Sequence, residues 1–573
     1  MSQEETNVEL KEAEVKDAEV KDTEVKDTEV KDGEVKDGEV KDGEVKDGEV
    51  KDAEATDGGL TDAEAQEAEL DQEEQEKQPM TGGLDACGDA ASPGAAEKNG
   101  SVHLKIPEEA EVKFTGLSKE ELLRVAGTPG WVRTRWALLI VFWLGWLGML
   151  VAAVVLILQA PPCRDLPELN WWNKGPLYQI GDVQAFSQNL KGLEQRLESL
   201  EQLKVKGLVL GPIHVAPADQ PKDLRFEEIS PDAGNLEQFK GLVKAAHKKG
   251  ISVVLDLTPN YRGSGSWFSN VSVTNVAERL KSALVFWLDQ GVDGVQLAGV
   301  ERVASVVPLL WSDIRAIVQN GTEERAKKRV LIGVTERTSA DEVSSLLSST
   351  GVDLLLSGVL RAANTDATER AQSIQQLYSS HNQSRLAWSL GGRADGHLAT
   401  LGGPALLRLH QLLLLTLPGT PVFNYGDEIG LEDEGTNFPK MLWDSAEEPN
   451  GTLKVRNREQ QEERESSRRL FQALSELRGR ERSLMFGDFL LLYNSSSSLA
   501  FLRSWDQSER YLAAFNWADE AATLPLSLPA LPQHATVSLS TDDGSPASNS
   551  KVQLEALRLG PGQATLLKFP YSA

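Results

Sequence analysis

The stretch GNLEQFKGLVKAAHKKGISVVLDLTPNY (Gly234–Tyr261) decides the fold of the largest part of this 573-residue chain. Its first half places apolar residues at the spacing of one helix face: Phe239, Leu242, Val243 and Ala246. Gly250 ends the helix pattern, and Ile251–Leu255 is an apolar run of the length of a buried strand. A helix followed directly by a buried strand is the building unit of α/β folds with a parallel sheet.

The same alternation recurs on both sides of this stretch. Seven further apolar runs have the length of buried strands: Leu177–Ile180, Gly207–Leu210, Val292–Leu297, Val330–Val334, Val352–Leu356, Arg385–Leu390 and Pro421–Tyr425. Eight strands alternating with helices predict a parallel (β/α)8 TIM barrel over residues 170–482, with its functional groups at the C-terminal strand ends. From residue 483 the helix patterns give way to short strand patterns, so we expect residues 483–573 to form an all-β domain.

Upstream of the barrel lies a segment that predicts a membrane span. Trp136–Leu158 comprises 23 residues without a charge or a side-chain amide. A helix of this length covers roughly 34 Å, enough to cross a hydrocarbon core of about 30 Å. The segment is too long and too far from Met1 for a cleaved signal peptide, which predicts an uncleaved signal-anchor helix over residues 136–158. Residues 113–135 then form a juxtamembrane segment and residues 159–169 a neck.

The residues that flank this span predict its orientation. More cations precede the span than follow it: Lys119, Arg124, Arg133 and Arg135, against Arg164 and Lys174. Cytosolic flanks carry the excess of cations, so the N-terminus is expected in the cytosol and the C-terminal part outside. N-glycosylation sequons agree with this, because one, Asn99, precedes the span and five follow it: Asn270, Asn320, Asn382, Asn450 and Asn494.

Small residues within the span form a stripe that another helix could pack against. Gly145, Gly148 and Ala152 recur at spacings of three and four, which lets helix backbones approach closely. Glycine is also frequent in membrane helices that have no such partner, so both interpretations stay open.

The two cysteines, Cys87 and Cys163, are expected on opposite sides of the membrane and therefore do not pair with each other. An unpaired extracellular cysteine suggests a bond to another chain, and a free thiol is the alternative. Because Cys163 lies five residues beyond the span, the partner's cysteine would also lie near the outer membrane face. This favours another membrane protein as the partner.

Residues 1–112 form an acidic tail. Residues 1–100 carry 33 acidic and 11 basic side chains, so most of the formal net charge of −28 lies there. Residues 14–53 are eight copies of EVKD followed by Ala, Thr or Gly, a period that fits no helix or strand face. The tail is therefore predicted to be disordered. The rest of the chain offers no basic face for nucleic acid, and we expect no cofactor and no metal.

Nearer the span, Ser118 and Glu121 have the spacing of a helix capping box, and Gly127 follows as a stop. The short helix that they predict would contact a partner's cytosolic loops or lie on the membrane lipid.

Three blocks of the barrel region resemble the α-amylase family of glycoside hydrolases. Gly234–Tyr261 is similar to the family's first conserved region, Gly291–Val300 to its second, and Leu417–Gly430 to the turn at its eighth strand. The resemblance implies the same barrel and the same terminal β domain. In that family a carboxylate nucleophile and a carboxylic acid act together on the glycosidic bond.

The residues at the corresponding positions depart from that chemistry. The resemblance places an arginine at Gln296, the nucleophile at Ala298 and the third carboxylate at Ala394. A methyl group cannot form a glycosyl ester. Glu336 is a remnant of the acid, and Asp256 survives from the first region, where we interpret it as structural. The chain also has a short connection after Tyr261, where amylases insert a substrate-covering domain. We therefore predict an inactive enzyme with no catalytic residue.

A membrane-anchored, amylase-like domain with a juxtamembrane cysteine resembles the heavy subunits of heteromeric amino-acid transporters. KFTGLSKEELLRVAGTPGWVRTRWALL (Lys113–Leu139) and the WW segment after Cys163 carry this resemblance, which covers residues 113–573. It implies that Cys163 is disulfide-bonded to a multi-pass light chain, which the heavy chain helps to fold and to reach the plasma membrane. It also implies transport of large neutral amino acids, cationic amino acids or cystine, depending on the light chain, and association with integrin β subunits.

Two other functions stay open at this stage. The first is a membrane-anchored α-glucosidase-like ectoenzyme that uses Glu336 with a second, unrecognised carboxylate. The second is an adhesion or signalling receptor whose cytosolic tail acts directly.

Overall fold

The computed structural model describes residue 116 and residues 118–159, 163–320, 328–361, 366–443, 454–529, 531–542 and 547–571. The acidic tail predicted over residues 1–112, with Cys87 and Asn99, lies outside the described residues, as does Asn450.

Two helices precede the neck. Helix α1 (Lys119–Ala126) starts at the predicted capping box, in which Ser118 Oγ accepts from the backbone N–H of Glu121 and the Glu121 carboxylate accepts from the backbone N–H of Ser118. Helix α2 (Pro129–Gln159) contains the predicted span, and no residue in it is buried by the protein. It is the one helix among the described residues that is long and apolar enough to cross a membrane.

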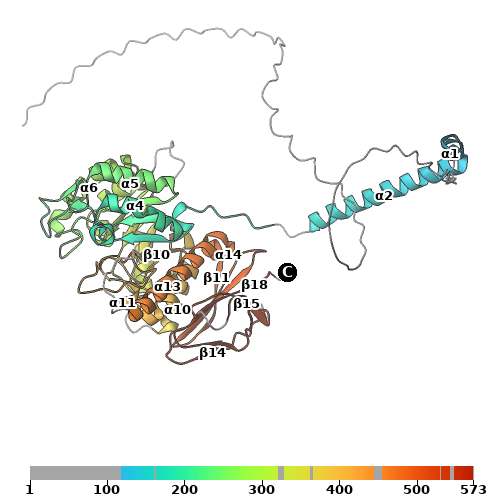
Figure 1. Cartoon of the computed structure of the whole chain (residues 1–573). Helices are drawn as coiled ribbons and strands as arrows, with labels where there is room; N and C mark the ends of the chain where they lie inside the picture. Colours follow the sequence, from blue (N-terminus) through green and yellow to red (C-terminus); the bar gives the residue numbers. More distant parts are fainter. Residues whose placement is uncertain are drawn as a thin grey trace, which may run out of the picture. The chain divides into compact units, whose positions relative to one another are not determined.

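The predicted barrel is confirmed (Figure 1). Its parallel strands are β1 (Leu177–Ile180), β2 (Gly207–Leu210), β5 (Ser252–Asp256), β6 (Gly294–Ala298), β7 (Val330–Val334), β8 (Leu354–Leu356), β9 (Ala387–Trp388) and β10 (Thr420–Asn424). They run in the order β8-β7-β6-β5-β2-β1-β10-β9. A parallel bridge between Leu355 and Leu386 brings β8 next to β9 and nearly closes the barrel.

Helices surround this barrel. The longer ones are α4 (Leu190–Gln202), α5 (Leu236–Lys248), α6 (Asn270–Asp289), α8 (Pro308–Gln319), α9 (Ala340–Thr350), α10 (Ala367–Ser380), α12 (Leu407–Thr416) and α13 (Lys454–Arg480). Shorter pieces are α3 (Val183–Ser187), α7 (Val300–Val306), α11 (Leu398–Gly402), α14 (Arg482–Phe486) and the 3₁₀ turns η1 (Trp171–Asn173), η2 (Gln383–Arg385) and η3 (Pro404–Leu406). Helix α5 buries the four apolar residues that predicted it.

Strands β8 and β9 are both shorter than their sequence patterns. The run Val352–Leu356 predicts five residues, whereas β8 has three. The run Arg385–Leu390 predicts six residues, whereas β9 has two. The Arg385 side chain is engaged elsewhere, because its Nη2 donates to the carbonyls of Leu347 and Val352, 2.7 and 3.1 Å away. A hairpin that the pattern does not predict, β3 (His214–Val215) with β4 (Arg225–Ile229), follows β2.

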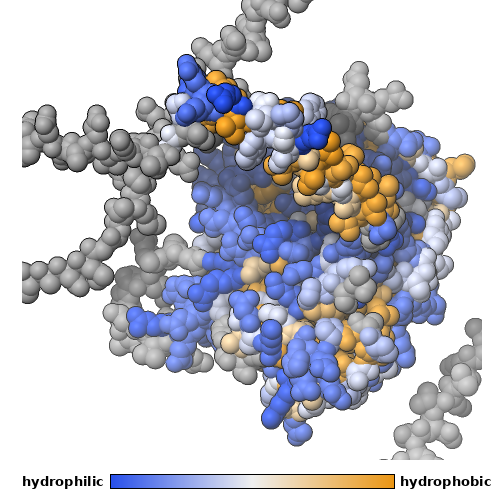
Figure 2. Space-filling view, turned by 90° about the vertical axis from the view of Figure 1, so that its right-hand side faces the viewer, coloured by the Kyte–Doolittle hydropathy of each residue, from blue (hydrophilic) through white to orange (hydrophobic). Residues whose placement is uncertain are grey.

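The terminal all-β domain is also confirmed. An antiparallel sheet takes the order β11-β12-β13-β18-β15-β16, from β11 (Asp488–Asn494), β12 (Ser498–Ser504), β13 (Arg510–Asn516), β18 (Ala564–Phe569), β15 (His534–Ser540) and β16 (Lys551–Gln553). Strands β14 (Ala522–Leu524) and β17 (Leu557–Leu559) form a separate pair. The face of the molecule in Figure 2 is largely hydrophilic over these domains, as expected for a surface in contact with water.

The barrel interior has two layers. Near the strand starts, apolar side chains such as Leu177, Val254 and Val422 pack with Trp172, which is 2% exposed. Towards the C-terminal strand ends the inward side chains become polar, with Gln179, Asp256 and Gln296 all buried. The upper, polar layer is where the chemistry of a TIM barrel is placed.

Candidate functional site

The polar layer at the barrel mouth is a chain of hydrogen bonds between three strands. Gln179 Nε2 on β1 donates to Gln296 Oε1 on β6 at 3.0 Å. Gln296 Nε2 in turn donates to Asp256 Oδ2 on β5 at 2.9 Å. Gln296 can serve both neighbours because an amide has one acceptor and one donor end.

Asp256 is bound on its other oxygen as well. Its Oδ1 accepts from the backbone N–H and the hydroxyl of Thr258, at 2.9 and 2.6 Å. The Thr258 Oγ1 then accepts from the backbone N–H of Ala298 at 3.0 Å. Burial raises the pKa of Asp256, although these hydrogen bonds oppose the rise. The carboxylate is thus occupied by the protein itself, in keeping with the structural role expected for it.

Arg393 lies across the opening of the barrel. Its Nη1 donates to the Tyr261 carbonyl beyond β5 at 3.1 Å, and its Nε to the Gly181 carbonyl beyond β1 at 3.4 Å. Its guanidinium is 4.7 Å from the centroid of the Tyr261 ring and 5.4 Å from that of Phe438, beyond β10. The Arg393 side chain thus contacts the segments that follow β1, β5 and β10 at the mouth of the barrel.

The other positions taken from the amylase resemblance lie nearer the solvent. Glu336, beyond β7, and Ala394 are exposed. Asp395, one residue after Ala394, is paired with Arg361, and the charge of Glu336 acts on that same arginine. Asp256 and the backbone of Ala298 are therefore brought together through Thr258. Glu336 instead acts on Arg361, and the Ala394 carbonyl accepts from Asn437 Nδ2 at 2.7 Å.

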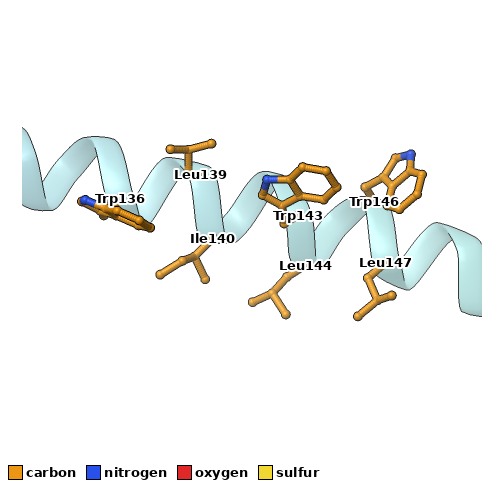
Figure 3. Close-up of a pocket in the computed structure, with 7 residues that line it drawn as sticks. All are labelled: Trp136, Leu139, Ile140, Trp143, Leu144, Trp146 and Leu147. Atoms are coloured by element: carbon orange, nitrogen blue, oxygen red, sulfur yellow. The ribbon is translucent and has the colours of Figure 1, made fainter.

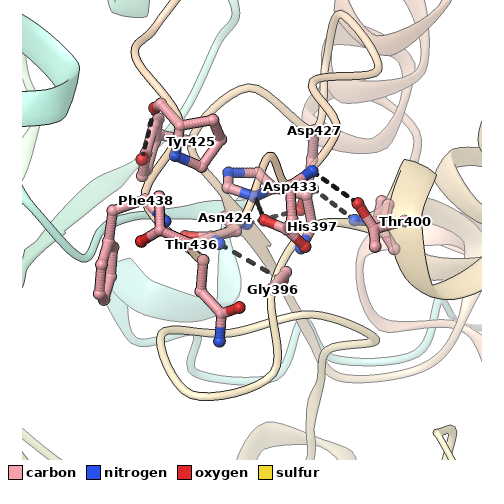
Figure 4. A network of polar contacts seen from close by, with 12 residues as sticks. Gly396, His397, Thr400, Asn424, Tyr425, Asp427, Asp433, Thr436 and Phe438 are labelled. Carbon is pink, nitrogen blue, oxygen red and sulfur yellow. Dashed lines mark hydrogen bonds and ion pairs between the residues drawn. The ribbon is translucent and has the colours of Figure 1, made fainter.

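A second polar network fixes the loop after β10 (Figure 4). His397 is 0% exposed; its Nδ1 lies 2.6 Å from Asp433 Oδ1, and its backbone N–H donates to Asp433 Oδ2 at 3.0 Å. Asp427 accepts from the backbone N–H groups of Asn424 and Leu398, at 2.7 and 2.9 Å. Burial raises the pKa of Asp427 well above its usual range. Sequence reasoning missed this network, since its members lie up to 36 residues apart.

The predicted packing stripe of α2 is open. A Cβ atom added to Gly145 or Gly148 would meet nothing within 4 Å, so a neighbouring helix has access to this backbone. Bulky side chains, among them Trp136, Trp143 and Leu147, occupy other sides of the helix (Figure 3). The rings of Trp143 and Trp146 meet edge to face, with their centroids 5.6 Å apart.

The neck places Cys163 beside a specific part of the folded domain. Cys163 is exposed and is the free cysteine among the described residues. The adjacent Arg164 donates from its Nη1 to Asp488 Oδ2 and from its backbone N–H to Asp506 Oδ2, both at 3.1 Å. Further along, Asn173 Nδ2 donates to the Ser384 carbonyl and to Thr420 Oγ1, at 2.9 and 3.0 Å, close to the starts of β9 and β10. The neck thus meets the barrel at the end opposite the mouth.

The sequon asparagines within the described residues are all exposed: Asn270, Asn320, Asn382 and Asn494. Within the part of the chain that the structure describes, no group of three His, Cys, Asp or Glu side chains has the arrangement of a metal site.

Comparison with known proteins connects these features. Residues 103–178 match the family model described as Solute carrier family 3 member 2 N-terminus, and residues 179–275 match the Alpha amylase catalytic domain. A protein of Oryctolagus cuniculus named amino acid transporter heavy chain SLC3A2 is 45% identical over 520 residues, covering 87% of this chain and 97% of that protein. Amino acid transporter heavy chain SLC3A1 of Rattus norvegicus is 24% identical, covering 82% of this chain and 89% of its own length.

Solved structures support the fold. An isomaltulose synthase variant from Erwinia rhapontici, in complex with sucrose, superposes with a TM-score of 0.57 at 14% identity, covering 71% of this chain and 100% of that one. At such low identity the likeness concerns the barrel architecture alone. The resemblance to the heavy subunits, and among them to the 4F2 cell-surface antigen heavy chain, is confirmed by the SLC3A2 match. The chain belongs to the family of amino acid transporter heavy chains of the SLC3A2 type.

Proposed function

We propose that this chain is the heavy, accessory subunit of a heteromeric amino-acid transporter. Cys163 forms a disulfide with a multi-pass light chain, and the heavy chain stabilises that subunit and brings it to the plasma membrane. The light chain determines whether large neutral amino acids, cationic amino acids or cystine are transported. The observation that carries this proposal is the 45% identity to a transporter heavy chain over 97% of its length.

The membrane helix is in keeping with an accessory role. From Trp136 to Leu158 it contains no ionisable side chain, whereas transport pathways place such groups within the bilayer. A covalent bond to the transporting subunit raises the effective concentration of every other contact between the two chains. A modest helix contact at Gly145, Gly148 and Ala152 is then enough to complete the assembly.

We further propose a type II orientation, with the N-terminus cytosolic and the barrel and β domain extracellular. Sugars would then be attached at Asn270, Asn320, Asn382, Asn450 and Asn494. Integrin β subunits and membrane lipid are further partners. Treatment with an N-glycosidase should increase the gel mobility of the full chain, and protease added outside intact cells should digest the barrel. Protection of the barrel from that protease would contradict the proposed orientation and favour the opposite one.

We propose that the barrel is not a glycosidase. Retaining enzymes need two carboxyl groups about 5–5.5 Å apart, a nucleophile and an acid, and here the position of the nucleophile is Ala298, which carries no carboxyl group. The Arg393 side chain that contacts Tyr261 and Gly181 also occupies the opening that a sugar would need. The ectodomain is expected to release no glucose from α-glucosides. Turnover that disappears in Glu336→Gln would instead support the ectoenzyme.

The disulfide is tested with the full-length chain, purified from cells after free thiols have been blocked and without reductant. Mass spectrometry of the species bonded to Cys163 should identify a multi-pass membrane protein. Cys163→Ser should remove the reducible heterodimer band and leave some association in mild detergent, because the other contacts remain. Cys87→Ser, the matched control, should leave the band in place. A wild-type chain without any disulfide-bonded membrane protein would contradict the proposal.

A further inference from the structure

The residue next to Cys163 is held against the terminal β domain by three contacts. Besides its hydrogen bonds to Asp488 and Asp506, the Arg164 guanidinium lies 4.5 Å from the centroid of the Trp505 ring. Asp488 begins β11, and Trp505 and Asp506 lie in the turn between β12 and β13. We name this set of contacts the Arg164 clamp.

A second anchor holds the other end of the neck. Trp171 Nε1 donates to the Lys328 carbonyl at 3.0 Å, and Trp172 is buried in the lower layer of the barrel. Between the two anchors the neck runs along a groove of about 260 Å³, which Asn382, Met485 and Phe486 also line. Residues 164–171 are therefore attached at both ends, by the Arg164 clamp and by the two tryptophans.

The clamp limits where the thiol can go. A flexible segment with the eight Cα–Cα steps between Cys163 and Trp171 would have a root-mean-square reach of roughly 16 Å. With Arg164 bound, the Cα of Cys163 stays about 3.8 Å from that of a fixed residue. Restricting one reactant in this way raises its effective concentration at a partner group whose position is also fixed.

We propose that Arg164 is a positioning residue for the interchain disulfide, acting through Asp488, Asp506 and Trp505. This inference rests on the proposed function, because it assumes that Cys163 bonds to a light chain. The Cys163 thiolate attacks the disulfide of a protein oxidant, and the light-chain thiolate then attacks the resulting mixed disulfide. One interchain S–S bond forms, and the oxidant leaves as a dithiol that carries the two electrons and two protons. The clamp presents the Cys163 sulfur for the second step.

The expected effect is moderate, because the ion pair is partly exposed, with Arg164 and Asp488 side chains 56% and 58% exposed. Exposed ion pairs and cation–π contacts are weak, so Arg164→Ala should slow formation of the covalent heterodimer by about three- to tenfold. Arg164→Lys, which keeps the charge but loses the planar guanidinium, should have a smaller effect.

The test follows the full-length chain by pulse labelling in cells that express its light chains. Thiols are blocked at each time point, and the reducible heterodimer band is quantified without reductant. Arg164→Asp is expected to slow the formation of this band. Adding Asp488→Arg to that variant should restore much of the rate of formation, because opposite charges face each other again. Arg225→Ala is the matched control, since Arg225 forms an exposed ion pair with Glu228 on β4. It should form the band at the wild-type rate.

A second measurement separates positioning from damage to the fold. The reaction of Cys163 with a small maleimide should stay within about twofold of wild type in Arg164→Ala, because the thiol is exposed with or without the clamp. A wild-type rate of heterodimer formation in Arg164→Ala, or failure of the charge exchange to restore the rate, would overturn the inference alone. If the wild-type chain formed no band dependent on Cys163, the proposed function would fail first, and this inference with it.

Discussion

At the level of single residues, the polar side chains at the barrel mouth bind one another, whereas those of a sugar site would bind the sugar. Gln296 accepts from Gln179 and donates to Asp256, and it stands where the amylase resemblance places an arginine. An arginine has donors only, so it could not accept the hydrogen bond of Gln179. The polar layer is thus complete without a ligand, which is consistent with the loss of the nucleophile at Ala298.

His214 should make the fold sensitive to acid. It is 0% exposed and lies against the rings of Phe226 and Tyr261, each with its centroid 5.3 Å away. Burial lowers the pKa of His214 to about 3, whereas in the unfolded chain it is about 6.5. Between these pH values the unfolded state binds more protons, so the free energy of unfolding falls as the pH falls from about 6.5 towards 3.

The variant His214→Phe keeps a ring in this aromatic cluster and removes the titration. We expect its loss of stability between pH 7 and pH 5 to be smaller than that of wild type by about 1–2 kcal/mol. Urea unfolding of the ectodomain at the two pH values measures this difference. His534→Phe is the control, since His534 is exposed, and it should keep the wild-type pH dependence. An unchanged pH dependence in His214→Phe would show that another group causes the acid sensitivity.

At the level of elements, the sequence predicted most strands because a buried parallel strand is apolar on both faces. Leu177–Ile180, Gly207–Leu210 and Val330–Val334 have the predicted bounds. The pattern failed at β9, where Arg385 binds carbonyls of neighbouring segments, and at the β3–β4 hairpin, where strands of two and five residues carry little periodicity. Pairing with distant segments decides such short strands, and a local pattern does not contain that information.

The stripe of Gly145, Gly148 and Ala152 on α2 gives a prediction for how this helix associates with the light chain. Gly148→Leu adds a side chain where the helix is open, so it should weaken association with the light chain by about tenfold in mild detergent. The effect should be clearest in the Cys163→Ser background, where no disulfide holds the chains together. Val154→Leu, on the opposite side of the helix, is the matched control. Equal association of the two variants would mean that another face of α2, or none, meets the light chain.

At the level of the whole molecule, the buried Arg503 joins the terminal β domain to the barrel, and the buried Arg478 binds neighbouring carbonyls within the barrel. Arg478 on α13 and Arg503 on β12 are both 0% exposed. Arg503 donates to the carbonyls of Thr416 and Gly487, both at 2.9 Å, while Arg478 binds the carbonyls of Leu415, Leu417 and Gly419. Apart from that of Gly487, which follows α14, these carbonyls lie at and beyond the C-terminus of α12, where the helix dipole favours positive charge.

Arg503→Met should therefore destabilise both domains together. It leaves buried carbonyls without donors, and we expect a loss of about 3 kcal/mol in the free energy of unfolding. Tryptophan fluorescence and far-ultraviolet circular dichroism should report one shared transition at lower urea. Arg337→Met, which removes an exposed ion pair with Glu342, should change the stability by less than about 1 kcal/mol. Two separate transitions in wild type would argue against this coupling.

The contacts that the sequence could not predict are those between distant segments. The pattern placed Cys163 outside the membrane, but nothing local announces that Arg164 meets Asp488, 324 residues away. Similarly, nothing local predicts that Arg393 contacts Tyr261 and Gly181, which lie 132 and 212 residues away. Chemistry that is lost can be read from a sequence, since a missing carboxylate is visible there. Packing that replaces the lost chemistry depends on the folded chain.

The neck reaches the barrel near the starts of β9 and β10, whereas Ala298 and Arg393 lie at the opposite pole. The attachment of the neck and the polar mouth are thus separate in space, so substitutions at the mouth leave that attachment undisturbed. In the proposed assembly, a bond at Cys163 leaves the pole with Ala298 and Arg393 available for contacts with other molecules.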